Sequence, residues 1–309
     1  MRAIAAMMVS AAVGLGAMAT VAVAQPRLDS TEIVFDASVP AMLEVKRAPT
    51  GHLLVRPVVN GEEAGWFIFD TGAGICCVST PHVDRLGLKD SGSVQAMGVG
   101  GSEQSRLVTA ETVTLGPATV RDHVLMVTDL SFLEEHLGDE IVGVIGYGVL
   151  NKCVVEMDLV EGRIGLHEPG ARDAGEMVWE ELNVRDRVPV VRARFEGREG
   201  EFRLDTGAKG HVTFHAPAVR EWDLLKDRET TASKMGGVGG FVEARSGEVA
   251  WFEIGGVRTE HVPATFAVEG KGTFGADSKA GNVGVELLTP FVLWFDYANS
   301  RIAFVQRGE

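Results

Sequence analysis

Short apolar runs separated by glycines and acidic turns recur along the chain, and this pattern predicts strands. Residues 53–55 and 67–69 are uninterrupted apolar runs beside turn residues, and residues 111–115 alternate between polar and apolar positions with a period of two. The few helical signals lie in residues 81–88 and 216–225, each long enough for one short helix. We therefore expect an all-β protein with tight turns between its strands.

The composition agrees with that expectation and limits the size of the folded units. Glycine accounts for 38 of the 309 residues, which is about 12% against a typical usage of roughly 7%. The glycines cluster between the apolar runs, where tight turns are expected. Hydrophobic residues make up 45% and charged residues 23%, which is typical of a globular protein and excludes disordered and fibrous classes. The length suggests two domains of about 150 residues, each able to bury a core.

The chain is acidic, with 43 Asp and Glu residues against 29 Lys and Arg residues and a formal net charge of −14. No run of five or more basic residues occurs in it. Because most of such a surface repels phosphate groups, a nucleic-acid partner is disfavoured.

The three cysteines, Cys76, Cys77 and Cys153, have no C-x-x-C spacing and cannot all pair with one another. This excludes a scaffold built on disulfides. Two alternatives stay open: a single bridge from Cys153 to Cys76 or Cys77, or three buried thiols that act as small hydrophobic residues. The second alternative is favoured.

The N-terminus has the layout of a secretory signal peptide. Arg2 is followed by an uncharged apolar stretch from residue 3 to 22, and Ala22-Val23-Ala24 forms an A-x-A cleavage site before Gln25. We expect export across the inner membrane to the periplasm, with no stable membrane span once the signal is cleaved. The alternative is an uncleaved anchor, because the stretch is long enough to span a bilayer.

An internal repeat organises the rest of the chain. Four blocks return in the same order at nearly constant offset, which indicates a duplicated lobe. We expect the joint in the turn-rich segment 169–175, and we divide the chain into a signal peptide (1–24), an N-terminal lobe (25–172) and a C-terminal lobe (173–309). The matched blocks are 65–73 with 200–208, 98–101 with 237–240, 141–146 with 279–284, and 157–164 with 295–302, at offsets of 135, 139, 138 and 138 residues.

Each lobe carries one Asp-Thr-Gly-Ala sequence at the end of an apolar run, beginning at Asp70 and at Asp205. One copy is weak evidence, since an aspartate that caps an ordinary turn explains it equally well. Two copies in the same context are strong, because an approximate two-fold axis brings both carboxyls together. Such a pair shares one proton. Its ionised member can take a proton from water while its protonated member polarises a carbonyl oxygen, which is the chemistry of amide hydrolysis.

The residues after each aspartate suit that role. Thr71 and Thr206 carry hydroxyls that can bond the backbone across the interface and fix the carboxyls. Gly72 and Gly207 permit the tight turn and let backbone N–H groups approach the acid oxygens. Ala73 and Ala208 complete the two motifs.

On these motifs the chain resembles the retropepsin-like aspartic peptidases in their fused, two-lobe bacterial form. The resemblance covers roughly residues 50–306 and includes a later apolar-apolar-Gly motif, Val144-Ile-Gly146 and, less well matched, Asn282-Val-Gly284. It implies two closed β-barrel lobes of the acid-protease type, a peptide cleft between them, and Asp70 and Asp205 as the catalytic pair. It also implies that two glycine-rich hairpin tips close over the substrate; the residues are Gly98, Val99, Gly100 and Gly101, and Gly237, Val238, Gly239 and Gly240. Plain glycine turns are the alternative for these tips.

Three departures from the family pattern change the expectations. Ala73 and Ala208 stand where pepsin-like enzymes place a hydroxyl that bonds a catalytic carboxylate, so we expect a higher pKa for the pair and activity at mildly acidic to neutral pH. Neither tyrosine, Tyr147 or Tyr297, lies in a predicted hairpin tip, which favours two glycine flaps over a single tyrosine flap. Tyr147-Gly148 and Val285-Glu286 replace the polar residues that follow the late glycine in viral enzymes.

Other candidate sites are weaker. His211 and His215 are four residues apart, but a solvated or loop role is favoured over metal binding. Cys76 and His82 have no counterpart in the second lobe, which argues against a thiol nucleophile. Phe291, Trp294 and Phe295 are expected in the core. Residues 26–50 precede the first repeat block, have no second-lobe equivalent of matching length, and form either an extra strand, which is favoured, or a pro-region over the cleft.

We therefore expect a monomeric aspartic endopeptidase that acts on peptide or protein substrates, with no cofactor and no metal ion. The rival hypothesis is a non-catalytic envelope protein that binds peptides or proteins and keeps the fold and the cleft. Intact acids in both lobes argue against this rival, since binding alone does not require both.

Overall fold

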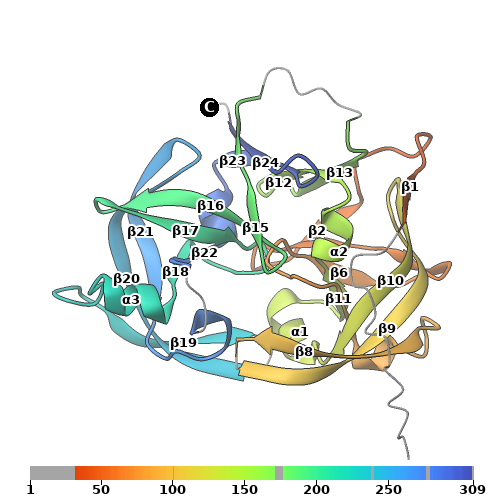
Figure 1. The fold of residues 1–309 in the computed structure, drawn as a ribbon, viewed down its shortest axis with the longest axis horizontal. Helices are drawn as coiled ribbons and strands as arrows, with labels where there is room; N and C mark the ends of the chain where they lie inside the picture. The colour runs from red at the N-terminus through yellow and green to blue at the C-terminus, as the bar shows by residue number, and fades with distance from the viewer. Residues whose placement is uncertain (1–31, 100, 171–176, 238–239, 276–278, 308–309) are drawn as a thin grey trace, which may run out of the picture.

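A computed structural model describes residues 32–99, 101–170, 177–237, 240–275 and 279–307. The described part is mostly β and forms two sheet-rich lobes, with a third sheet between them at the top of the view (Figure 1). The predicted signal peptide, Gly100, Val238, Gly239 and most of the predicted joint lie outside the described residues.

The first lobe holds an eleven-stranded sheet in which most strands come from the short apolar runs. Its order is β2-β3-β6-β11-β7-β10-β9-β4-β5, with β1 added on β10 and β8 on β9. The strands are β1 (Ile33–Phe35), β2 (Val45–Arg47), β3 (Leu53–Val55), β4 (Val58–Val59), β5 (Glu62–Glu63), β6 (Trp66–Phe69), β7 (Cys77–Ser79), β8 (Lys89–Gly98), β9 (Gly101–Leu115), β10 (Ala118–Thr128) and β11 (Ile141–Ile145).

The second lobe holds an eight-stranded sheet of the order β15-β16-β17-β22-β18-β21-β20-β19. Buried phenylalanines fill its core, and four of them, Phe195, Phe202, Phe214 and Phe252, lie against one another. The strands are β15 (Asn183–Arg185), β16 (Val188–Phe195), β17 (Arg198–Leu204), β18 (Val212–Phe214), β19 (Thr231–Gly237), β20 (Gly240–Ile254), β21 (Val257–Ala267) and β22 (Gly281–Val283).

The sequence repeat is also a repeat of strand pairing. In the first lobe β11 runs parallel to β6 and antiparallel to β7, and in the second lobe β22 runs parallel to β17 and antiparallel to β18. The pairing therefore defines register counterparts, meaning residues that occupy the same place in the two lobes. By this register Ile68 corresponds to Arg203, Cys77 to Thr213, and Val144 to Asn282.

Neither lobe is formally a closed barrel, and the main strand order of each sheet does not return to its first strand. In the second lobe β16 makes one further pairing with β20, at Arg194–Glu253 and Phe195–Phe252. In the first lobe the counterpart of β16 is split into β3 and β4, and Pro57, which has no N–H to donate, lies in the break. The closed barrels predicted from the sequence are thus seen only as two sheet-rich lobes.

The third sheet joins the two lobes, in the order β13-β12-β23-β24-β14. Its central pair consists of β12 from the first repeat and β23 from the second, which are antiparallel over five residues. Phe291, Trp294 and Phe295 of β23 are buried, as predicted. The strands are β12 (Val154–Asp158), β13 (Arg163–His167), β14 (Trp179–Glu181), β23 (Phe291–Asp296) and β24 (Arg301–Gln306).

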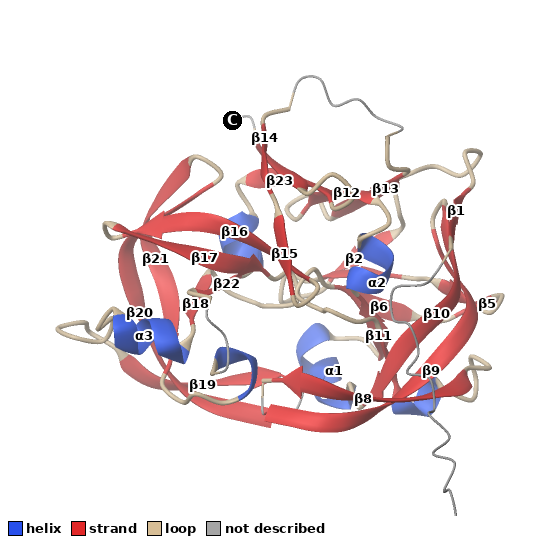
Figure 2. Ribbon diagram, viewed as in Figure 1, coloured by secondary structure: helices blue, strands red, loops and turns tan. Residues whose placement is uncertain are grey.

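The described helices are few and short (Figure 2). The predicted helix at 216–225 is confirmed as α3 (Ala216–Glu221), whereas 81–88 contributes only to a 3₁₀ turn at Thr80–His82. Sequence patterns missed α1 (Ser131–Leu137), α2 (Tyr147–Leu150), α4 (Val285–Leu288) and the 3₁₀ turn Gly272–Phe274. None of the helices in these ranges has the length and apolarity needed to cross a membrane.

The segment before the first repeat block forms strands in its described part, with β1 on β10 and β2 on β3. A short part of it also has a counterpart in the second lobe, while the expectation that no equivalent of matching length exists is not contradicted. In the first lobe Met42 pairs with Gly165, and Lys46 pairs with Leu54. At the equivalent places of the second lobe Trp179 pairs with Ala303, and Asn183 pairs with Val190. Residues 42–47 and 179–184 are therefore equivalent, and among the described residues no strand of the second lobe corresponds to β1.

Candidate active site

Asp70 and Asp205 directly follow the equivalent strands β6 and β17, and neighbouring strands hold their backbones. The Asp70 N–H donates to the carbonyl of Ile145 at the end of β11 (2.9 Å), and the Asp205 N–H donates to the carbonyl of Val283 at the end of β22 (3.0 Å). Both loops therefore leave their sheets in the same direction and meet between the lobes.

The two threonines join the loops across the lobe interface. The N–H of Thr71 donates to Oγ1 of Thr206 (3.0 Å), and the N–H of Thr206 donates to Oγ1 of Thr71 (3.1 Å). Each hydroxyl then donates to the opposite lobe, Thr71 to the carbonyl of Leu204 (2.7 Å) and Thr206 to the carbonyl of Phe69 (3.0 Å). The buried pair thus fixes the distance between the two aspartates, as the sequence predicted.

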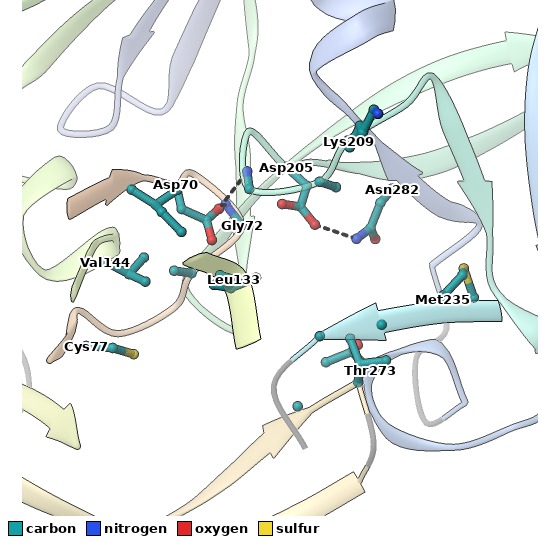
Figure 3. Close-up of a pocket in the computed structure, with 18 of the residues that line it drawn as sticks. Asp70, Gly72, Cys77, Leu133, Val144, Asp205, Lys209, Met235, Thr273 and Asn282 are labelled. Atoms are coloured by element: carbon teal, nitrogen blue, oxygen red, sulfur yellow. Dashed lines mark hydrogen bonds between the residues drawn. The ribbon is translucent and has the colours of Figure 1, made fainter. Parts of the chain in front are cut away.

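The two carboxyl groups lie side by side against the opposite glycines (Figure 3). Oδ1 of Asp70 accepts the N–H of Gly72 (2.7 Å) and, from the other lobe, the N–H of Gly207 (3.1 Å). A side chain at Gly72 would overlap the Asp205 carboxyl, and one at Gly207 would overlap that of Asp70. Only glycine permits this approach.

Burial raises the pKa of both carboxyls, and for Asp70 the neighbouring charge of Asp205 raises it further. On the Asp205 side, the amide of Asn282 and the positive charge of Arg203 oppose the rise in pKa. Two carboxyls this close do not both ionise easily, so the pair holds one shared proton over a wide pH range.

Asn282 and His215 extend the site on one side only, and sequence patterns did not identify them as site residues. Asn282 Nδ2 donates to Oδ2 of Asp205 (2.7 Å), and His215 Nε2 lies 2.8 Å from Oδ1 of the same amide. His215 is fully buried, which corrects the solvated or loop role expected for it. The polar Asn282 inside an otherwise apolar motif, where the first lobe has Val144, was the available signal.

The late glycines of each lobe permit a second close approach. The N–H of Tyr147 donates to the carbonyl of Ala73 (2.9 Å), and the N–H of Val285 donates to that of Ala208 (3.0 Å). A side chain on the preceding Gly146 or Gly284 would collide with those same carbonyl oxygens. α2 and α4 therefore begin against the two aspartate loops.

A cleft of about 680 Å³ lies over the two carboxyls and is lined by both lobes. The β8–β9 and β19–β20 hairpins face the aspartates across it, and their tips touch, since Val99 lies against Gly237. Of the predicted flap residues, Gly98, Val99, Gly101 and Gly237 line the cleft, while Gly240 pairs with Gly237 at the hairpin turn.

The weaker candidates Cys76, His82 and His211 do not line the cleft. Cys76 is a buried free thiol whose pKa is raised by burial to about 11, and Cys77 and Cys153 are also buried and free. His211 faces Glu286 (3.1 Å), and His82 faces Glu140 (3.5 Å). In the described ranges no group of three or more His, Cys, Asp or Glu side chains is placed to hold a metal ion.

Comparison with protein families gives two matches to one family model, described as aspartyl protease, at residues 55–149 and 191–286. Each match covers one lobe and contains one of the two aspartates, and together they span more than half of the chain. No curated protein matches the chain at a significant level.

Proposed function

The chain belongs to the aspartyl protease family, with one family domain in each lobe, and from this premise we propose that it is an aspartic endopeptidase. The observation that carries the proposal is the pair of carboxyls, Asp70 and Asp205, held by cross-lobe hydrogen bonds at the base of a cleft of about 680 Å³ that both lobes line. Both acids, both threonines and both glycines needed for that geometry are present.

In the proposed reaction Asp205 holds the negative charge, because Asn282 donates to it and Arg203 lies near it. Asp205 takes a proton from a bound water, whose oxygen attacks the peptide carbonyl carbon, while Asp70 gives its proton to the carbonyl oxygen. The tetrahedral diol then collapses. The amide nitrogen receives the proton held by Asp205, the C–N bond breaks, and a diol hydroxyl returns a proton to Asp70.

We also propose that the protein acts as a periplasmic monomer. The N-terminal sequence supports export, and the presence of both halves of the cleft in one chain supports a monomer. In this proposal the boundary between the lobes lies near residue 172, and each lobe is a variant of the acid-protease barrel. The second lobe, with its β16–β20 pairing, comes closest to a closed barrel.

The proposal is tested with Asp70→Asn and Asp205→Asn variants on a mixed protein substrate, with Asp84→Asn as the control. Asp84 is exposed and lies away from the cleft. We expect cleavage by the wild type and by Asp84→Asn, and at least a thousandfold loss in both site variants. Cleavage by either site variant at the wild-type rate contradicts the assignment. A wild type that cleaves nothing, with or without its N-terminal segment, supports the non-catalytic binding protein instead.

A further inference from the structure

The two halves of the cleft present different chemistry at equivalent places. Around Asp70 the register counterparts Ile68, Cys77 and Val144 line the cleft, and around Asp205 the corresponding positions are Arg203, Thr213 and Asn282. One layer further out Met126 pairs with Cys77 just as Thr265 pairs with Thr213. Each apolar residue of the first lobe thus has a polar or cationic counterpart in the second.

The first-lobe half is a continuous apolar surface. Ile68, Met126 and Val144 are almost fully buried and belong to one cluster with Leu130 and Leu137. α1 closes this half from the side, with Leu133 and Phe132 facing the cleft. Figure 3 shows Cys77, Leu133 and Val144 together on the Asp70 side. An apolar substrate side chain fits this half, because it loses contact with water there without leaving a polar group unpaired.

The second-lobe half is cationic. Arg203 lines the cleft with only 11% of its side chain exposed, and Lys209 and Lys234 are exposed at its rim. Among the described residues, Asp186 lies 3.1 Å from Lys279 and 3.9 Å from Arg203. Asp186 thus interacts more closely with Lys279 than with Arg203.

The charge of this half is opposite to that of the protein. The chain carries −14 overall, yet among the described residues the acids that line the cleft are the catalytic pair, which shares a proton, and Glu103 on the first-lobe hairpin. A carboxylate is repelled by most of the surface and attracted to Arg203, Lys209 and Lys234. The planar guanidinium of Arg203 also has the geometry to bind a carboxylate through two parallel hydrogen bonds.

We propose, on the basis of the proposed peptidase function, that the enzyme selects peptide bonds between an apolar residue and an acidic residue. The apolar side chain occupies the first-lobe half of the cleft, and the Asp or Glu side chain occupies the second-lobe half beside Arg203. Thr213 and Thr265 supply further hydroxyl donors to that carboxylate.

The test uses peptides that differ only at the scissile bond, with Leu on one side and Glu, Gln, Leu or Lys on the other, each in both orders. We expect kcat/KM for the Glu peptide in one order to exceed that for the Gln peptide at least tenfold, with Lys the poorest. Added salt should reduce the Glu preference. The ends of products from a mixed protein digest should show the same pairing of apolar and acidic residues.

The internal repeat supplies matched variants. Arg203→Ile copies Ile68 of the first lobe, and we expect it to lower the Glu-to-Leu ratio of kcat/KM at least tenfold. Because Arg203 also lies near Asp205, the measured quantity is this ratio and not the absolute rate. Lys234→Gln copies Gln95 of the first lobe, because Gln95 and Lys234 each lie three residues before the glycine, Gly98 or Gly237, that ends the first strand of the hairpin. This variant should lower the Glu-to-Leu ratio less than Arg203→Ile does. Arg192→Ile is the control, because Arg192 is 74% exposed on β16 and does not line the cleft.

The outcomes separate this proposal from the function on which it rests. A wild type that cleaves peptides with equal kcat/KM for Glu and Gln, or product ends without acidic enrichment, overturns the specificity and leaves the peptidase function standing. An unchanged Glu-to-Leu ratio in Arg203→Ile also overturns it, and if that variant does not fold, an unchanged ratio in Lys234→Gln does so. Failure to cleave any peptide or protein overturns the peptidase function itself.

Discussion

At the scale of single residues, Thr71 and Thr206 determine how the two aspartates meet. Each hydroxyl both accepts a backbone N–H and donates to a backbone carbonyl of the other lobe, so four buried backbone groups depend on two side chains. Buried backbone groups that lose their partners are costly. The stability of the interface and the geometry of the site therefore rest on the same atoms.

We expect Thr206→Val to lower the free energy of unfolding by about 2–5 kcal/mol, because it leaves the Thr71 N–H and the Phe69 carbonyl without partners. Thr206→Ser keeps the hydroxyl and is the control, with a loss of about 1 kcal/mol for the methyl group. Urea unfolding of both variants measures the difference. Equal stability of the valine and serine variants contradicts the role of the hydroxyl.

Asn282 and His215 set the charge balance of the catalytic pair. Asn282 donates to Asp205 and is itself held by His215. Because Ala73 and Ala208 carry no hydroxyl, the sequence predicts weak support for the ionised form. The structure shows that Asn282 compensates for this lack on the Asp205 side, while its counterpart Val144 gives Asp70 no such donor.

We expect Asn282→Val, which copies the first lobe, to move the acidic limb of the kcat/KM profile to higher pH. Loss of the amide donor destabilises the carboxylate, which raises its pKa, so the active singly protonated pair forms at higher pH. The wild-type maximum should lie at mildly acidic to neutral pH, since burial raises the pKa of both carboxyls. A wild-type maximum below about pH 3.5, or an unmoved acidic limb in the variant, is the contrary result.

At the scale of elements, the two long hairpins β8–β9 and β19–β20 form the side of the cleft that faces the aspartates. They turn at Gly101 and Gly240, whose φ angles of +136° and +120° are accessible to glycine and strained for other residues. The glycine-rich tips predicted from composition are thus explained by backbone conformation.

We expect Gly240→Ala to raise KM and lower kcat/KM about tenfold or more, because a distorted tip no longer closes on substrate. Gly256→Ala is the control. Gly256 also has a positive φ of +73° and open space around it, but it lies in the β20–β21 turn and not at a hairpin tip beside the cleft. Both variants should lose about 1 kcal/mol of stability. Equal kinetics in the two variants argue against a role for the tip in substrate binding.

Elements were predictable where local sequence decides them. The apolar runs gave β3 and β6, and the helical stretch after residue 215 gave α3. α2 and α4 are single turns that form because Gly146 and Gly284 let them begin against the aspartate loops, and this packing depends on residues far along the chain. α1 ends at Gly138 in a left-handed conformation, a common helix stop, but it is only seven residues long.

At the scale of the whole molecule, the sheet formed by β12, β13, β14, β23 and β24 makes the lobes one structure. β12 and β23 pair over five residues, and β14, which precedes the second lobe, pairs with the last strand β24. Tyr147 of α2 also contacts Tyr297 at the end of β23, with ring centroids 5.9 Å apart. Neither lobe keeps all its pairings without the other.

We therefore expect the chain to unfold in a single cooperative transition. The test uses two variants that each keep one tryptophan, Trp66 on β6 of the first lobe or Trp222 beside α3 of the second, with the other tryptophans changed to Phe. Fluorescence of both should report the same urea midpoint as circular dichroism. Two separate midpoints would show that the lobes unfold independently.

The main part of the site was predictable because the repeat alone pairs Asp70 with Asp205. Arg203, Asn282 and His215 were not, since their places depend on how β17, β18 and β22 align. The offset between matched repeat blocks varies along the chain. An error of one residue in aligning the two repeats changes which side chain is predicted to face the cleft. That alignment becomes certain only when strand pairing is known.

The difference between the two halves of the cleft has a consequence for the orientation of a bound chain. A cleft with true two-fold symmetry accepts an extended peptide equally well from N to C and from C to N. Here Ile68 and Arg203 occupy equivalent places with unlike side chains, so the two orientations are not equivalent. In the function we propose, the fused, diverged repeat therefore favours one direction of the bound peptide, which a pair of identical subunits does not impose.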